Sequence, residues 1–268
     1  MKIRLIYAVF ALMVMVFAGC TQADDPIPGE QELLISARET GFGGLTTEAF
    51  TRDFNLALWS TTDATQHETH RMTYDGTDWN TVSTQLLPAS ALAYCGQTVT
   101  VTSHGQYSVA LTKDQSNADA FHLADVMIAT GMVDENGSLS LHFKHHYAKV
   151  TFRVTLADEF QGSEPISHLS VVTKDENVSE VITHHSVTDG YSAYIPAGTY
   201  SAGQSFVKVA IGAYMGDNRL TSTLNEGMTL KAGTHYKFDI RVGKDKVQLT
   251  LDSDNHPFGS GWKDTDLN

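Results

Sequence analysis

Cysteine is scarce in this sequence. Only Cys20 and Cys95 occur among 268 residues. If Cys20 carries a lipid, as its context below predicts, Cys95 is left alone, which excludes an internal disulfide and any disulfide-based framework. Cys95 ends the apolar stretch Ala91–Cys95, where a small buried thiol is expected. A catalytic thiol is the alternative, but the sequence has no obvious Cys/His/Asn arrangement to support one.

Basic residues are also few. Lys and Arg together number 18 against 31 Asp and Glu, which gives a formal net charge of −13. Proteins that bind nucleic acid use clusters of basic side chains to neutralise phosphates, and the sequence contains no such cluster. The composition therefore argues against a nucleic-acid role, while the acidic balance favours the solubility of an exposed protein.

Sequence motifs of common enzyme classes are missing. There is no Gly-x-Ser-x-Gly elbow, no phosphate-binding glycine loop and no dinucleotide fingerprint. The carboxylate pairs Asp24-Asp25 and Asp158-Glu159 are interpreted as solvated linker and turn residues, because hydrolytic pairs act only at a defined separation. We therefore predict no enzymatic activity and no cofactor.

The twelve histidines raise the question of a metal site. The densest groups are His142, His145 and His146, and the pair His184-His185. Zinc requires three or four ligands that converge on one point. Alternation along a strand sends His142 and His146 to one face and His145 to the other, unless a bulge intervenes. Neither group has the helical His-Glu-x-x-His pattern, so we predict no metal site.

The amino terminus has the three parts of a secretory leader. Lys2 and Arg4 precede an apolar run that ends at Phe17, and small residues follow before Cys20. The run is several residues short of the ~20 needed to span ~30 Å of hydrocarbon. The final Phe-Ala-Gly-Cys resembles a bacterial lipobox, although Phe17 stands where Leu is usual. We predict a signal peptide over residues 1–19 and a lipid on Cys20; the alternative is a plain signal peptide followed by an incidental cysteine.

The residues after the predicted lipid site are acidic. Thr21–Asp25 resembles the export signal that sends Bacteroidetes lipoproteins across the outer membrane. Residues 20–30 are therefore predicted to be a lipidated acidic linker, which places the protein on the outer face of the outer membrane. A solvated linker without an export role is the alternative.

From residue 31 onward, short runs of alternating apolar and polar residues predict strands. The clearest apolar faces are Val150, Phe152, Val154 and Leu156; Phe206, Val207, Val209 and Ile211; and Tyr236, Phe238, Ile240 and Val242. Asp75-Gly76, Asn136-Gly137 and Asp189-Gly190 stand where tight turns need residues that accept positive φ. Short strands separated by frequent turns predict an all-β fold built from two β-sandwiches.

One long alternating stretch, from Ser138 to Leu156, changes phase midway. Its apolar residues are odd-numbered as far as Phe143 and even-numbered from Val150. A slip of one residue turns every side chain to the opposite face, so the stretch cannot be one regular strand. We predict a bulge or a domain boundary close to Tyr147. The predicted domains, both of ordinary size, are an amino-terminal β-sandwich at residues 31–147 and a carboxy-terminal β-sandwich at residues 148–268.

A family resemblance runs through the second half of the sequence. Its pieces, in chain order, are Ala118-Asp119 to Ala129, including the acidic-apolar run Asp125–Ala129; Leu141–Val150; Tyr194-Ile195-Pro196; Leu230–Tyr236; and Trp262. Together they resemble the fimbrillin-like proteins of Bacteroidales over about residues 118–262. Residues 31–117 match more loosely, best at Trp59 and from Tyr74 to Trp79. The resemblance implies two transthyretin-like antiparallel β-sandwich domains in tandem, and a role as a stalk, tip or anchor subunit of type V surface pili.

The resemblance also implies a mode of assembly. In the polymerising members a protease removes the first strand after an arginine, and a strand of another subunit fills the opened edge and apolar groove. Candidate cleavage sites are Arg38 and Arg52; the alternative is that both are ordinary surface arginines. The predicted partners are the outer membrane, through Cys20, other fimbrial subunits, and host or bacterial surface ligands. The short tail after Trp262 favours a terminal or accessory position over a stalk position.

A surface glycan-binding lipoprotein that does not assemble into pili is the alternative from another class. Exposed tryptophan rings can stack on sugars, which makes Trp59 and Trp79 candidate glycan contacts. Tryptophans are, however, more often anchors of a protein core. Glycan binding that is lost on changing Trp59 or Trp79 to Ala would favour this alternative, whereas ladders of multimers resistant to sodium dodecyl sulfate would favour polymerisation.

Overall fold

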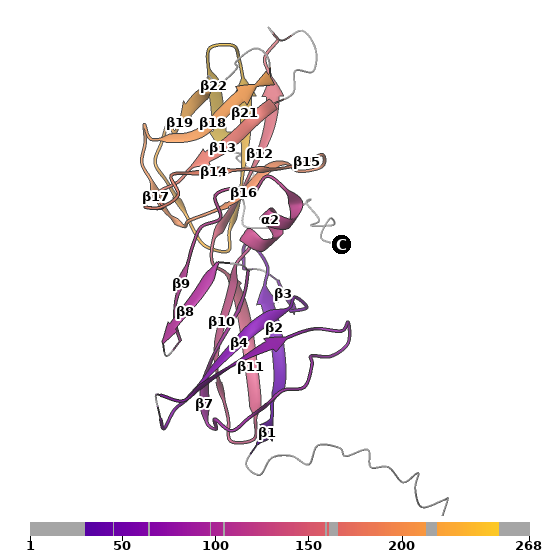
Figure 1. Cartoon of the computed structure of the whole chain (residues 1–268). Coiled ribbons are helices and arrows are strands. Elements are labelled where there is room, and N and C mark those ends of the chain that lie inside the picture. Colours follow the sequence, from indigo (N-terminus) through magenta and orange to yellow (C-terminus); the bar gives the residue numbers. More distant parts are fainter. Residues whose placement is uncertain are drawn as a thin grey trace, which may run out of the picture.

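Strands account for nearly all of the regular structure, as the alternation predicts. The computed structural model describes residues 30–44, 46–63, 65–96, 98–103, 105–158, 160, 166–212 and 219–251. Besides the helix α2 (Ala118–Ala124), the described elements are strands, numbered up to β22 (Figure 1). The all-β class is therefore confirmed. The predicted signal peptide, Cys20 and Trp262 lie outside the described residues. Across the described ranges, no helix combines the length and the apolar character needed to cross a bilayer.

The strands before residue 146 form a seven-stranded sheet in the order β3-β2-β11-β10-β7-β4-β5. Their bounds are β2 (Leu34–Thr40), β3 (Thr47–Ala49), β4 (Phe54–Ser60), β5 (His67–Met72), β7 (Ala89–Cys95), β10 (Met127–Val133) and β11 (Ser138–His145). Two short pairs accompany the sheet: β1 (Gln31–Glu32) with β6 (Ser83–Thr84), and β8 (Val99–Ser103) with β9 (Gln106–Val109). β10 and β11 pair only at Met127↔His145 and Ile128↔Lys144. Beyond these residues the sheet opens into two layers, β5-β4-β7-β10 and β11-β2-β3.

The side chains between these two layers form one core. Phe143 of β11 stacks on Phe50 with ring centroids 3.8 Å apart and meets Phe54 of β4 edge-on at 5.2 Å. All three rings are buried. Leu139 and Leu141 share the buried face of β11 with Phe143, as the period of two requires. These contacts hold the two layers face to face.

The predicted change of phase marks the passage between two cores. β11 ends at His145, and β12 (Ala148–Leu156) begins after a two-residue connection. Phe143 belongs to the amino-terminal core, whereas Val150 and Phe152 belong to another. The stretch is therefore two strands, as the phase predicts. The domain limits stay a prediction, although no sheet of the described strands contains elements from both sides of this connection.

The strands from β12 onward form a five-stranded sheet, β15-β16-β12-β21-β22, a four-stranded sheet, β14-β13-β18-β19, and the short pair β17-β20. Their bounds are β13 (Ile166–Val172), β14 (Glu180–Ile182), β15 (His184–Ser186), β16 (Gly190–Ile195), β17 (Gly198–Tyr200), β18 (Ser205–Ile211), β19 (Leu220–Thr223), β20 (Met228–Leu230), β21 (His235–Val242) and β22 (Val247–Leu251). Phe238 of the larger sheet packs on Phe206 of the smaller one at 5.4 Å. In Figure 1 these strands form the upper half, the strands up to β11 form the lower half, and α2 lies between them.

Two of the described strand pairs are parallel, and no sequence motif indicates this arrangement. β2 runs parallel to β11 from Leu34↔Ser138 to Glu39↔Phe143. β12 runs parallel to β21 from Lys149↔His235 to Leu156↔Val242. Parallel partners need a long crossover connection, so no tight turn marks them. The sheets are otherwise antiparallel, as predicted.

The turn motifs fall where the sequence places them. Gly137, before β11, has a φ of 78°, and Gly190, at the start of β16, has a φ of 86°. A Cβ atom would lie 2.4 Å from the Glu32 carbonyl oxygen at Gly137 and 2.5 Å from the Phe152 carbonyl oxygen at Gly190. Both positions therefore need glycine for the backbone angle and for the close approach of a neighbouring strand.

Candidate functional site at the amino-terminal strand

Strand β2 occupies the middle of its layer. It pairs with β11 on one side and with β3 on the other. Leu33, Ile35 and Ala37 face the amino-terminal core, whereas Leu34 and Arg38 face outward. Without β2 and β3, the backbone groups of β11 along this edge would lose their partners, and an apolar groove would open beside Phe143.

Arg38, the first candidate cleavage site, lies within this ladder. Its side chain is exposed, but its backbone pairs with His142 of β11 and Ala49 of β3. A protease needs a segment that can leave its strand partners, so cleavage follows the population of an opened state. The bond after Arg38 is therefore protected by two neighbouring strands.

Arg52, the second candidate, lies in the connection between β3 and β4. Its guanidinium holds Asp125: Nη1 donates to Oδ2 at 2.9 Å, and Nη2 donates to the Asp125 carbonyl oxygen at 3.0 Å. The bond after Arg52 is thus outside the ladders, but the side chain that a trypsin-like protease would recognise is already bound.

Asp125 follows α2 and accepts a second donor from β11. Nδ1 of His145 donates to its Oδ1 at 2.7 Å. We call Arg52, Asp125 and His145 the Asp125 clamp. Burial alone would raise the pKa of Asp125, but the hydrogen bond and charge of His145, with the charges of Arg52 and Lys149, hold it below its ordinary value. The buried carboxylate is therefore kept ionised by partners from three separate segments.

Phe42, in the connection between β2 and β3, reaches the carboxy-terminal half. Its ring stacks on His145 with centroids 3.7 Å apart and planes 19° apart. It also lies 6.0 Å from the ring of Tyr194 and packs against the carboxy-terminal core. The next residue, Gly43, donates its N–H to the carbonyl oxygen of Gly233 at 2.7 Å. The sequence analysis did not predict this contact. The sequence feature that could have indicated it is a lone aromatic residue among glycines, Gly41-Phe42-Gly43-Gly44.

The two candidate glycan contacts lie in different surroundings. Trp59 of β4 is only 5% exposed and forms a small cluster with Ala57 and Leu92 on the outer face of its layer. Trp79 is half-buried, with its ring 4.9 Å from Phe54 at the edge of the amino-terminal core. A ring as buried as that of Trp59 offers no face for stacking on a sugar.

The residues considered for catalysis or metal binding, Cys95 and the histidines, have structural surroundings. Cys95 is buried, and burial raises the pKa of its thiol, which lowers its reactivity. His145 is engaged with Asp125, and the ring of His185 packs on Tyr191. In the part of the chain that the structure describes, no group of three or more His, Cys, Asp or Glu is arranged to hold a metal ion.

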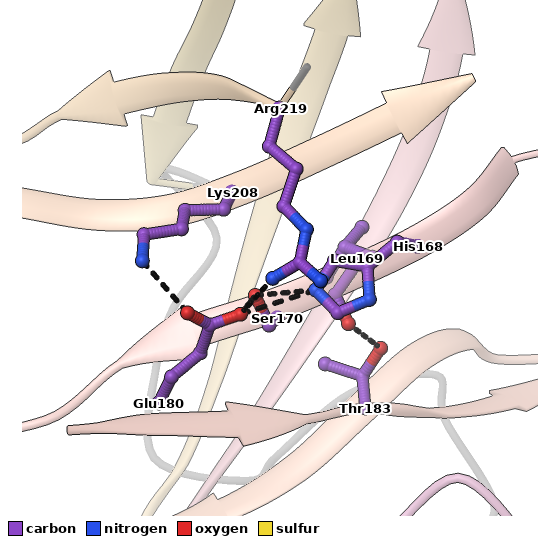
Figure 2. A network of polar contacts seen from close by, with 7 residues as sticks. All are labelled: His168, Leu169, Ser170, Glu180, Thr183, Lys208 and Arg219. Carbon is purple, nitrogen blue, oxygen red and sulfur yellow. Dashed lines mark hydrogen bonds and ion pairs between the residues drawn. The ribbon is translucent and has the colours of Figure 1, made fainter. Parts of the chain in front are cut away.

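A polar network lies on the four-stranded sheet and centres on Glu180 (Figure 2). Its Oε1 accepts from Ser170 Oγ at 2.6 Å and Arg219 Nη1 at 2.7 Å, and its Oε2 accepts from Lys208 Nζ at 2.7 Å. His168 uses one nitrogen, Nε2, toward both Ser170 and Glu180. A catalytic triad needs the histidine to bridge serine and acid through its two nitrogens, so this network stabilises the sheet and is not a nucleophile site.

Replacement of Glu180 tests that structural role. Burial would raise the pKa of Glu180, but hydrogen bonds from Lys208, Ser170 and His168 lower it to about 2. We expect Glu180→Gln to lower the free energy of unfolding by ~1–2 kcal/mol at pH 7, a modest loss because the cations reach solvent. A carboxylate with a depressed pKa stabilises above its unfolded pKa, so the difference should shrink as the pH falls from about 4.5 toward about 2 in urea titrations. Exposed Glu176→Gln is the control; a pH-independent difference would contradict this account.

The architecture and the site together define the class of protein. The described strands form layered β-sheets, with one central strand carried by the amino-terminal segment, so the chain is an all-β protein. The model of the fimbrillin-like family matches residues 46–254. The chain belongs to the fimbrillin-like family, as the sequence motifs predicted.

Candidate cell adhesion proteins from two Bacteroides species share the fold at low sequence identity. A candidate cell adhesion protein from Bacteroides ovatus has a TM-score of 0.53 and 11% identity, with 82% of this chain and 95% of that chain covered. One from Bacteroides uniformis has a TM-score of 0.51 and 11% identity, covering 87% and 100%. A fimbrial protein from Bacteroides ovatus has a TM-score of 0.44 and 14% identity, with 82% of this chain and 51% of that chain covered. This chain therefore spans about half of that protein. No curated protein sequence matches the chain.

Proposed function

We propose that this protein is a cell-surface fimbrial subunit or an accessory or tip adhesin, assembled by β-strand addition. The observation that carries the proposal is the position of β2, which covers the edge of β11, with Ile35 and Ala37 of β2 and the preceding Leu33 facing the core. A strand from another subunit with the same alternation could satisfy the same backbone groups and the same apolar positions. Membership of the fimbrillin-like family supports this role and supplies no evidence for an enzyme.

The proposed route to the surface begins at the amino terminus. The signal peptide over residues 1–19 directs export, and a lipid on Cys20 holds the protein on the outer membrane before assembly. Several acyl chains, at about 0.8 kcal/mol per buried methylene, would make this attachment durable. Removal of the segment before Asp53 would then discard the anchor together with β2 and β3.

Between the two candidate cleavage sites, the geometry favours Arg52. A cut after Arg38 would divide β2 within a paired ladder and leave β3 attached. A cut after Arg52 falls just before β4 (Phe54–Ser60) and would free all of β2 and β3. The exposed edge of β11 would then be complete from Ser138 to Phe143.

One experiment on cells that naturally express the protein tests both cleavage and assembly. We expect wild-type and Arg38→Gln cells to give ladders of multimers resistant to sodium dodecyl sulfate, with a mature chain that begins at Asp53. Arg52→Gln should lose the ladder and keep a lipid-bearing Cys20, measured by mass spectrometry and by partition into detergent. A ladder that persists in Arg52→Gln, or a wild-type surface protein that still begins at Cys20, would contradict cleavage at this site.

A further inference from the structure

The segment before Arg52 makes a second contact that strand replacement along β11 does not explain. Phe42 crosses from the β2–β3 connection to the carboxy-terminal half and stacks on His145. Tyr194 and His235 lie around its ring at 6.0 and 6.3 Å. We call His145, Lys149, Tyr194 and His235, with the carbonyl group of Gly233, the Phe42 socket.

The chemistry of the socket fits an aromatic ring better than an aliphatic side chain. Nζ of Lys149 lies 5.9 Å from the ring centroid of Phe42, a cation–π distance. The face of the same ring stacks on the imidazole of His145. Aliphatic groups can fill the volume but cannot make either contact.

The socket also has a polar anchor for an extended backbone. The carbonyl group of Gly233 accepts the N–H of Gly43, the residue directly after Phe42, at 2.7 Å. A ligand that places an aromatic ring in the socket and a backbone N–H beside it reproduces both contacts. An extended peptide segment has both groups at this spacing.

We propose that the Phe42 socket is a binding site for an aromatic side chain on an extended segment, filled by Phe42 before maturation and by the inserted strand of a neighbouring subunit afterwards. This second occupancy rests on the proposed removal of the segment before Asp53, because only that cut empties the socket. In the present fold the aromatic residue stands five positions after Ala37, the last apolar core-facing residue of β2. A strand running in the same direction as β2 therefore needs an aromatic residue at that offset to fill groove and socket together.

The same placement makes the segment a bridge between the two halves. Phe42 lies beside Tyr194 and His235 of the carboxy-terminal half, whereas β2, on the same segment, is part of the amino-terminal layer. An inserted strand that lacked the aromatic residue would complete the β11 edge but leave the socket empty. The aromatic residue is thus the part of the strand that couples insertion to the junction.

The socket can be tested in the intact chain without any cleavage. Phe42→Ala empties it, and N-acetyl-L-phenylalaninamide supplies a ring with a neighbouring N–H. We expect this probe to bind Phe42→Ala saturably, to shift the NMR signals of His145 and His235, and to bind about tenfold more tightly than N-acetyl-L-leucinamide. Wild-type protein, whose socket is filled, should show no such shifts.

Tyr74→Ala, which removes an aromatic ring that packs on Trp79 at the amino-terminal core, is the matched control and should behave like wild type. Equal binding of both probes, binding by wild type, or no binding to Phe42→Ala would each overturn the proposal. If Phe42→Ala does not fold, Phe42→Leu keeps the bulk, and adding the aromatic probe should displace the leucine and shift the same signals. These readouts do not depend on cleavage in cells, so failure of the socket and failure of strand-addition assembly are distinguishable.

Discussion

Asp125→Ala should lower the free energy of unfolding by about 3 kcal/mol at neutral pH. The Asp125 side chain is 11% exposed and is the shared partner of Arg52 and His145, so its loss leaves two donors without their acceptor. Breaking a buried ion pair typically costs ~3–5 kcal/mol, and the lower end applies because the Arg52 side chain is 22% exposed and can reach water. Chemical denaturation of the purified protein measures the loss.

The pH dependence gives this prediction a second readout. The pKa of Asp125 is held below its ordinary value in the folded state, so its contribution is complete above the unfolded pKa of ~3.9 and is lost as the pH falls below that value. The difference between wild type and Asp125→Ala should therefore be greatest near neutral pH and shrink in acid. Asp119→Ala, at an exposed position of α2, should change stability by only a few tenths of a kcal/mol. Equal effects of the two substitutions would mean that the Asp125 clamp contributes little.

Trp59→Ala should lower the free energy of unfolding by about 3–5 kcal/mol, the range for deleting a buried aromatic side chain. The ring is 5% exposed and packs with Ala57 and Leu92, while Val101 of the β8–β9 hairpin contributes to the same cluster. Truncation would leave a cavity between the hairpin and the sheet. Thermal or urea unfolding of the variant measures the effect.

The same position separates the pilus function from the glycan-binding alternative. Trp59→Leu keeps apolar bulk but removes the flat ring, so it should stay folded and leave any carbohydrate binding unchanged. Trp79→Ala, at a half-buried position, should destabilise less than Trp59→Ala. Glycan-array binding that vanishes in folded Trp59→Leu would contradict the structural role and favour the glycan-binding function.

Local patterns in the sequence were sufficient to predict the all-β class, several of the strands and several of their turns. Alternation locates β12, β18 and β21, because a half-buried strand imposes a period of two on its own residues. The change of phase between Phe143 and Val150 locates the passage from one core to the other. Each of these signals lies within about twenty residues of chain, where neighbouring side chains report directly on the same element.

Contacts between distant segments could not be predicted in the same way. The parallel pair β2–β11 and the clamp of Arg52 on Asp125 join residues that no turn or period connects. The family resemblance identified Arg52 as a cleavage candidate, but no feature of the sequence indicates that it pairs with Asp125. The contacts of Phe42 are marked in the sequence only by the glycines around it, because its partners come from the distant strands β11, β16 and β21.

The parallel pairing of β2 with β11 also has a kinetic consequence. Leu34 pairs with Ser138, which lies more than a hundred residues later in the chain. Contacts of such long sequence separation form late, because the intervening loop must close first. During that interval the edge of β11 is unoccupied, and any competing strand nearby meets it before the chain's own β2 has docked. In each folding event, β2 of the same chain therefore competes with strands of neighbouring molecules for the edge of β11. The local concentration of those strands determines which one pairs with β11 first.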